Sequence, residues 1–305
     1  MQRTILPPHL QPGDTIGITA PAGYVSADRV AGAVQVLQGW GFKVKSGATI
    51  GTGEFYFSGT DEARLADLQA MLDDREVKAV LMGRGGYGCS RIIDALDFSA
   101  FVAAPKWICG FSDITVLHSH IHQCFDIATL HSPMCGAITA ETRDEFYIQS
   151  LLRALLGGEE DYSFPAHPVQ RAGSAEGVLV GGNLAILAHL TGSISQLDTR
   201  GKILFIEDIG EHLYNIDRLL VNLKRSGQLE HLAGLVCGSF TDMEDTERPY
   251  GKSLEEIILQ NMAGYNFPVA FGLPCGHDPV NVTLRLGQQH TLRVSEKGGM
   301  LSVVL

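Results

Sequence analysis

The sequence lacks several features that mark whole classes of protein. It has six cysteines but no C-x-x-C pair, no run of basic residues, and no apolar stretch long enough to span a bilayer. The formal net charge of -11 disfavours binding to a nucleic-acid backbone, which depends on clustered lysine and arginine. We therefore expect neither a nucleic-acid partner nor a membrane partner.

We do not expect the first residues to form a secretory signal. The stretch MQRTILPPHLQPGDT contains prolines and lacks the apolar region that such signals need. Cysteines scattered through apolar runs, without a pairing pattern, are typical of buried free thiols in a reducing compartment. The sequence therefore predicts a cytoplasmic protein with free, buried cysteines.

The first half of the chain alternates between two kinds of segment. Apolar, strand-like runs such as TIGIT, KAVLMG and KWICG are separated by helix-like segments, two of which follow the capping residues Ser26 and Thr60. This alternation predicts an α/β, flavodoxin-like domain whose mostly parallel sheet is covered on both faces. Functional groups in such sheets gather at the carboxyl ends of the strands.

The pattern changes after residue 140, and a chain of 305 residues is long enough for two domains. We predict an N-terminal domain at 1–140, a linker at 141–173, and a C-terminal domain at 174–305. The C-terminal domain reads as mixed α/β and β-rich. Its segments VTLRLG and HTLRV flank a short glycine-containing turn, which predicts a β-hairpin.

Ser112 occupies the point where a strand-like run becomes helix-like, in ICGFSDITVLHSH. A serine at this place either caps the helix or holds its hydroxyl out of a sharp turn as a nucleophile. The segment GFSDI has the first glycine of the G-x-S-x-G motif, but Ile114 stands where the second would be. The motif alone leaves both interpretations open.

A glycine-rich segment, GRGGYGCS, follows the third predicted strand. Consecutive glycines let backbone amides approach a ligand closely, although they also serve in turns that matter only for packing. The segment fits neither nucleotide-binding glycine motif, so we expect no cofactor. Arg84 can bind a carboxylate or pair with a nearby aspartate. We take Arg84, Gly85 and Tyr87 as candidates for substrate binding.

Three further features carry ionisable side chains. Glu207 lies at the carboxyl end of the predicted strand ILFIE, and His277 lies in the loop CGHDPVN; each has a solvated surface residue as its alternative interpretation. His118 and His122 are four residues apart on one helix, a spacing found in zinc sites. No third ligand stands near them, so we expect no metal site and a helix surface that carries histidines.

Eight motifs, in order along nearly the whole chain, give the sequence a specific resemblance. They are APAG, FSGTDEAR, GRGGYG, GFSDIT, HSPM, GVLVGGNL, ILFIEDIGEH and GLPCGHDPVNVTL. Through them the sequence resembles the LD-carboxypeptidase family of serine peptidases, which includes the muropeptide tetrapeptide carboxypeptidases and the microcin C immunity proteins.

The resemblance implies a role for several residues. It places the nucleophile at Ser112, the acid at Glu207 and the base at His277, with the active site in the cleft between the domains. The backbone N–H groups of Gly86 and Asp113 are then expected to form the oxyanion hole.

The resemblance also implies an activity, namely release of the terminal D-alanine from murein tetrapeptides during peptidoglycan recycling, by a homodimer. Two alternatives remain open. The first is an immunity-type hydrolase that cleaves a microcin C-like peptidyl or aminoacyl nucleotide with the same triad. The second is a ligand-binding module without catalytic activity.

Overall fold

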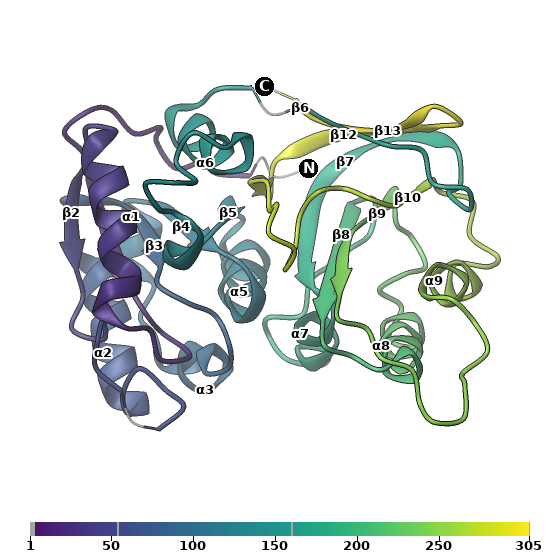
Figure 1. Cartoon of the computed structure of the whole chain (residues 1–305), viewed down its shortest axis with the longest axis horizontal. Coiled ribbons are helices and arrows are strands. Elements are labelled where there is room, and N and C mark those ends of the chain that lie inside the picture. Colours follow the sequence, from purple (N-terminus) through teal and green to yellow (C-terminus); the bar gives the residue numbers. More distant parts are fainter. Residues whose placement is uncertain (1–3, 54, 160, 305) are drawn as a thin grey trace.

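The computed structural model describes residues 4–53, 55–159 and 161–304. Its two β-sheets lie side by side, the first built mainly from the N-terminal half and the second from the C-terminal half (Figure 1). Helix α6, Phe146–Leu156, lies above the junction between them (Figure 1). The chain is therefore a two-sheet α/β structure, as the alternation of segments predicts.

The first sheet has the strand order β11-β5-β4-β3-β1-β2. Strands β1 to β5 are parallel and span Thr15–Thr19, Lys43–Ser46, Val77–Met82, Trp107–Gly110 and Thr129–His131. Helices α1 to α5 span Ala27–Gly39, Asp61–Asp73, Cys89–Ile92, Ser99–Ala103 and Thr115–Phe125. Separate apolar cores cover the two faces of the sheet, as expected for parallel strands.

Two helix starts agree with the capping residues seen in the sequence. The Ser26 side chain accepts a hydrogen bond from the Arg29 N–H at the start of α1, and the Thr60 side chain accepts one from the Ala63 N–H at the start of α2. Such caps satisfy backbone donors that have no partner within the helix. They fix where both helices begin relative to the strands before them.

The second sheet has the order β10-β9-β8-β7-β12-β13-β6 and is mixed. The strands β6 to β10, β12 and β13 span Asp161–Phe164, Gly173–Asn183, Ile203–Ile209, Gly234–Thr241, Val269–Ala270, Gln289–Ser295 and Gly298–Val303. Strands β7 to β10 are parallel, and β12, β13 and β6 continue the sheet in antiparallel order. Helices α7, α8 and α9, at Leu184–His189, Leu213–Arg225 and Leu254–Asn261, lie together beside the parallel strands (Figure 1).

The segment 141–173, expected to be a linker, carries regular structure that joins it to both sheets. Ile148 and Leu151 of α6 belong to the apolar core of the first sheet. Strand β6 pairs with β13 of the second sheet. The helix forms because FYIQSLLRALL buries apolar residues at helical spacing. The domain limits at 140 and 173 stay a prediction of the sequence.

The predicted hairpin between VTLRLG and HTLRV is wrong. Strand β11, Leu284–Leu286, pairs antiparallel with β5 of the first sheet, whereas β12 pairs with β7 and β13. Gly287, with a φ of +88°, turns the chain from one sheet to the other. Alternating apolar residues show that a segment is a strand but not which strand it joins. The crossing attaches the C-terminal half directly to β5.

All six cysteines are free, but Cys124 is exposed whereas the other five are buried as expected. Cys124 lies near the end of α5, where the helix emerges from the core. None of the helices in the described ranges is long and apolar enough to cross a membrane.

Candidate active site

Ser112 lies in a strained turn directly after β4. Its φ is +65°, in the left-handed region that residues other than glycine rarely adopt. The serine does not cap a helix, because neither the 3-10 turn Ser112–Ile114 nor α5 has a side-chain cap. Its hydroxyl makes no hydrogen bond with any residue that the structure describes. The turn therefore presents the hydroxyl in the way that a nucleophile elbow does.

The glycine-rich loop after β3 lies directly against this turn. A β-carbon on Gly85 would come within 2.9 Å of the Ser112 Cβ and 3.2 Å of its Oγ. Glycine at position 85 is therefore what allows the loop and the serine to approach so closely.

Asp113 fastens the glycine-rich loop to the turn. Its buried carboxylate accepts a 2.8 Å hydrogen bond from the Cys89 N–H, and burial raises the pKa of Asp113. Within the described ranges, the backbone N–H groups of Gly86 and Asp113 have no hydrogen-bond acceptor. Both donors are therefore available to a ligand beside Ser112.

Glu207 and His277 form a close pair on the other side of the junction. The Glu207 Oε2 lies 2.6 Å from the His277 Nδ1, at the carboxyl end of β8. The Glu207 side chain is fully buried and that of His277 is 14% exposed. The interpretation of either residue as a solvated surface group is therefore wrong. A buried carboxylate on Nδ1 fixes the imidazole tautomer and leaves Nε2 free to accept a proton.

The loop that carries His277 is held by side chains and by a glycine. Gly276 has a φ of +139°, and a β-carbon there would collide with the Ser239 Oγ. The Asn281 Oδ1 accepts a 3.0 Å hydrogen bond from the Gly276 N–H, and the Ser239 N–H donates to the Cys275 carbonyl at 2.8 Å. These contacts aim the imidazole from the second half of the chain toward the first.

Phe111 brings the two halves of the site together. Its ring contacts that of His277 at a tilt of 59°, with centroids 4.8 Å apart, and it directly precedes Ser112. In the described part of the chain, no hydrogen bond joins the Ser112 hydroxyl to the His277 ring. The structure thus pairs His277 with Glu207 and places His277 against the residue that precedes Ser112.

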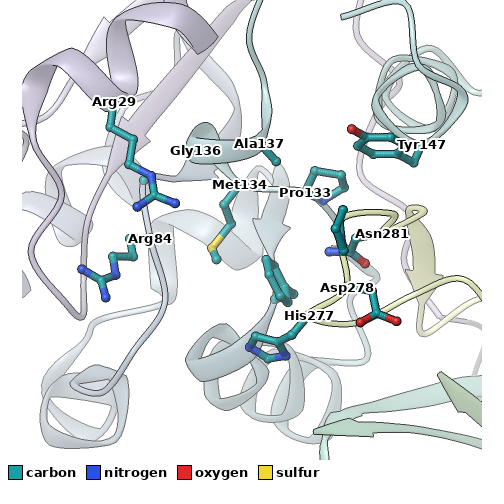
Figure 2. Close-up of a pocket in the computed structure, with 13 residues that line it drawn as sticks. Arg29, Arg84, Pro133, Met134, Gly136, Ala137, Tyr147, His277, Asp278 and Asn281 are labelled. Carbon is teal, nitrogen blue, oxygen red and sulfur yellow. The ribbon is translucent and has the colours of Figure 1, made fainter. Parts of the chain in front are cut away.

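A cavity of about 240 Å³ opens beside these groups, between the two halves (Figure 2). His277, Asp278 and Asn281 line it from the second half, and Phe111 and Arg84 are among the lining residues of the first. Ser112 is not one of its lining residues. The predicted cleft between the two halves is therefore present, with the histidine on its wall.

The other predicted substrate-binding residues lie in different places. Arg84 lines the cavity, and Gly85 touches Ser112. Tyr87 lies outside the cavity lining, 45% exposed, with its ring 6.0 Å from that of Phe57. Arg29, which the sequence analysis missed, also lines the cavity. A signal was present, since a cation in the first turn of a helix opposes the helix dipole.

The histidines of α5 are buried, so the expected histidine-bearing helix surface is wrong. The helix is sandwiched between the first sheet and β7, and His118, His120 and His122 are all at most 5% exposed. His118 Nε2 lies 2.9 Å from the Gly110 carbonyl, and His122 Nε2 lies 2.9 Å from the Lys202 Nζ. Burial lowers the pKa of His118 to about 4 and that of His122 to about 3. Among the described residues no three metal-ligating side chains converge.

Comparison with known proteins shows which family the sequence matches. The N-terminal domain of LD-carboxypeptidases matches residues 16–132, and their C-terminal domain matches residues 176–292. A Bacillus subtilis protein named "Probable murein peptide carboxypeptidase" is 36% identical over 298 residues, covering 97% of this chain and 93% of that protein.

Two further relatives carry names that describe two different functions. The crystal structure of muramoyltetrapeptide carboxypeptidase from Oxalobacter formigenes superposes with a TM-score of 0.87 at 29% identity, covering 95% of this chain and 98% of that one. The microcin C7 self-immunity protein MccF of Escherichia coli is 28% identical over 311 residues, covering 90% of this chain and 89% of that protein. The chain belongs to the LD-carboxypeptidase family and is a serine-type LD-carboxypeptidase.

Proposed function

We propose that this protein releases the terminal D-alanine from murein tetrapeptides by hydrolysing an L–D peptide bond. The observation that carries the proposal is the 2.6 Å contact between Glu207 and His277, on the cleft beside the strained turn at Ser112. The names of the relatives from Bacillus subtilis and Oxalobacter formigenes support the substrate class.

The first step is attack by Ser112. The His277 Nε2 takes the proton from the Ser112 hydroxyl as its oxygen bonds to the carbonyl carbon of the penultimate residue. Glu207 accepts a hydrogen bond from the Nδ1–H, which holds the tautomer and stabilises the imidazolium. The carbonyl oxygen becomes an oxyanion, for which the N–H groups of Gly86 and Asp113 are the donors.

The second step breaks the peptide bond, and the third regenerates the enzyme. His277 gives its proton to the leaving nitrogen, so D-alanine departs and the rest of the peptide stays bound to Ser112 as an ester. A water molecule then loses a proton to His277 and attacks the ester carbonyl. The proton returns to the serine oxygen as the acid product leaves.

Proton transfer needs the imidazole to reach the hydroxyl. The loop Cys275–Asn281 belongs to the second half and Ser112 to the first, so closure of the cleft around substrate would bring the imidazole and the hydroxyl together. Catalytic hydrogen bonds often become short only in the complex with substrate. We therefore propose that the substrate itself, held by both walls, brings the serine and histidine into contact.

The test is mass spectrometry of a tetrapeptide muropeptide before and after incubation with the purified protein. We expect loss of one alanine with the wild type and none with Ser112→Ala. Labelling of Ser112 by a fluorophosphonate probe, absent in the variant, separates an enzyme from a binding module. Wild-type turnover by the variant would overturn the serine mechanism, and EDTA-sensitive turnover would point to a metal.

The second candidate is cleavage of an aminoacyl nucleotide, which the MccF relative favours. The structure adds one observation in its favour: exposed aromatic rings lie beside the glycine-rich loop. A β-carbon on Gly86 would come 2.9 Å from the Tyr56 hydroxyl, and Tyr56 is 52% exposed. A ring there can stack on a base or a sugar. Incubation with aminoacyl sulfamoyl adenosine separates the two candidates, because only the second predicts its cleavage.

The setting of the reaction is part of the proposal. We place it in the cytoplasm, in peptidoglycan recycling, and all six cysteines being free fits a reducing compartment. Homodimer formation, implied by the family resemblance, stays a prediction that sedimentation equilibrium tests.

A further inference from the structure

We infer that Arg29 and Arg84 together form a subsite for the free carboxylate of the residue that is released. The inference rests on the proposed function and adds how the cleft selects the end of a peptide. Both arginines line the same cavity as His277, although they come from different elements. Arg29 lies in the first turn of α1, and Arg84 follows β3.

Arg29 is held over a glycine, and its guanidinium has no partner among the described residues. A β-carbon on Gly136 would collide with the Arg29 Nε and lie 2.8 Å from its Nη2, so glycine at 136 leaves room for the guanidinium. No hydrogen bond or ion pair joins this guanidinium to a residue within the described ranges. Figure 2 shows the side chain directed toward the cavity. An exposed cation kept without an acid is available to an anionic ligand.

The side chain of Arg84, which lines the same cavity, is partly fixed by a hydrogen bond. Its Nη1 donates a 2.9 Å hydrogen bond to the Tyr24 carbonyl, which uses one N–H of the guanidinium and leaves the others free. No described carboxylate pairs with it, so the commoner outcome of a local salt bridge is not found. A planar guanidinium with a fixed orientation can bind a carboxylate through two parallel hydrogen bonds.

The charges of the cavity are separated. Figure 2 shows both arginines on one side and Asp278 on the other, with His277 between them. The Asp278 carboxylate accepts a 2.8 Å hydrogen bond from the Thr241 hydroxyl and belongs to the second half of the chain. An anionic group of the substrate is therefore favoured on the arginine side and repelled from the opposite side.

The chemistry of the reaction places the carboxylate in the cavity that His277 shares with the two arginines. In a C-terminal residue the free carboxylate is bonded to the same carbon as the nitrogen that His277 must protonate. The carboxylate therefore lies within a few ångströms of the imidazole, on the cavity side. A peptide that continues beyond this residue would put a neutral amide against two cations. The subsite thus selects the chain end and holds it beside the proton donor.

Binding to an inactive variant tests the subsite without turnover. In Ser112→Ala we compare, by titration calorimetry, a tetrapeptide muropeptide with the same peptide carrying a C-terminal amide. We expect the acid to bind roughly 10- to 100-fold more tightly, as for a hydrogen-bonded ion pair. Adding Arg29→Gln or Arg84→Gln should remove most of this difference by weakening only the acid.

Two controls fix the interpretation. Arg29→Lys should keep part of the preference, because it retains the charge but not the paired donors. Arg200→Gln removes a surface arginine that pairs with Asp198, far from the cavity, and should leave the preference unchanged. With Ser112 intact, Arg29→Gln should raise KM for the acid more than it lowers kcat.

The outcomes separate this inference from the proposed function. Equal binding of acid and amide by Ser112→Ala, or equal weakening of both by Arg29→Gln, would overturn the subsite. Tight, arginine-dependent binding of the acid without any turnover by the wild type would support the subsite and overturn the proposed hydrolysis. Release of D-alanine by the wild type together with collapse of the preference would support both.

Discussion

The two halves of the chain hold the proposed catalytic groups by different means. In the first half, the backbone does the positioning: Ser112 adopts a left-handed φ, and Gly85 packs against it where no β-carbon would fit. In the second half, side chains do it: Glu207 holds the ring of His277, and Asn281 holds the loop before it. The proposed nucleophile is thus fixed by local geometry and the proposed base by a buried hydrogen-bond network.

This difference has consequences for what can disturb each part of the site. We name the part around Ser112 and Gly85 the backbone wall, and the part around Glu207 and His277 the side-chain wall. Backbone geometry does not titrate, so the φ of Ser112 itself should respond to steric changes and not to pH; the titratable group of this wall is the buried Asp113, which binds the Cys89 N–H. The wall around His277 contains two adjacent buried carboxylates, Glu207 and Asp208, whose charge must be stabilised in the interior. It should respond to the loss of a hydrogen bond and to pH.

Removing the charge of Glu207 should break the side-chain wall. Glu207→Gln keeps the size of the residue but permits the wrong imidazole tautomer, so we expect kcat to fall by about 10⁴. Steady-state kinetics on the tetrapeptide measures the loss, and thermal unfolding checks the fold. Glu211→Gln, four residues further on and half-buried, is the matched control and should retain activity. Comparable losses in both variants would contradict the assignment of the acid.

Adding one carbon should break the backbone wall. Gly85→Ala places a β-carbon 2.9 Å from that of Ser112, so the glycine-rich loop must move away and carry the Gly86 N–H with it. We expect kcat to fall by about 10²–10³, the cost of one oxyanion donor. Gly39→Ala is the control, since nothing lies within 4 Å of a β-carbon there. Unchanged kcat in Gly85→Ala would show that the loop takes no part in the chemistry.

The comparison also separates what the sequence predicts from what it does not. The alternation of strands and helices predicts the parallel strands of the first sheet, because the spacing of apolar residues within each segment identifies it as a strand or a helix. The turn at Ser112 can be recognised in the sequence, because a glycine and a serine stand between a strand-like and a helix-like segment. By contrast, the burial of Glu207 depends on β7 and β9, which flank β8 and come from distant parts of the chain. Local patterns therefore do not identify Glu207 as the predicted acid, and only the family resemblance points to it.

The errors have the same physical origin. Strand β11 pairs with β5 instead of β12, and helix α5, which carries the buried histidines, packs against β7 of the second sheet. Both depend on contacts between the two halves, which no local period records. A cation in the first helical turn is a weak signal by itself, and the place of Arg29 in the cavity depends on the fold.

Titration of Asp208 should appear in the pH dependence of stability. Burial raises its pKa from 3.8 to about 6, although it accepts hydrogen bonds from Asn183 and the Ala185 N–H. The folded state therefore binds a proton more tightly than the unfolded state. Stability from this group is full below pH 3.8 and is lost as the pH rises through about 6.

Asp208→Asn does not titrate, so it isolates this contribution. We expect the stability of the wild type relative to the variant to fall by on the order of 2 kcal/mol between pH 4.5 and 7.5. Urea unfolding at both pH values measures it. If the difference in unfolding free energy between the wild type and the variant stays constant with pH, then burying the charged form of Asp208 does not destabilise the fold.

The smallest effect should come from relieving the strain at the nucleophile. Ser112→Gly removes the side chain that disfavours the left-handed φ of +65°, so we expect a gain of about 1 kcal/mol in the free energy of unfolding. Ser112→Ala is the matched comparison, since it loses the hydroxyl but keeps a β-carbon, and should show no gain. Because backbone strain does not titrate, the difference between the two variants should be the same at pH 4.5 and 7.5. Equal stabilities of the glycine and alanine variants would mean that the turn is not strained, and a pH-dependent difference would mean that the backbone wall is coupled to the buried carboxylates.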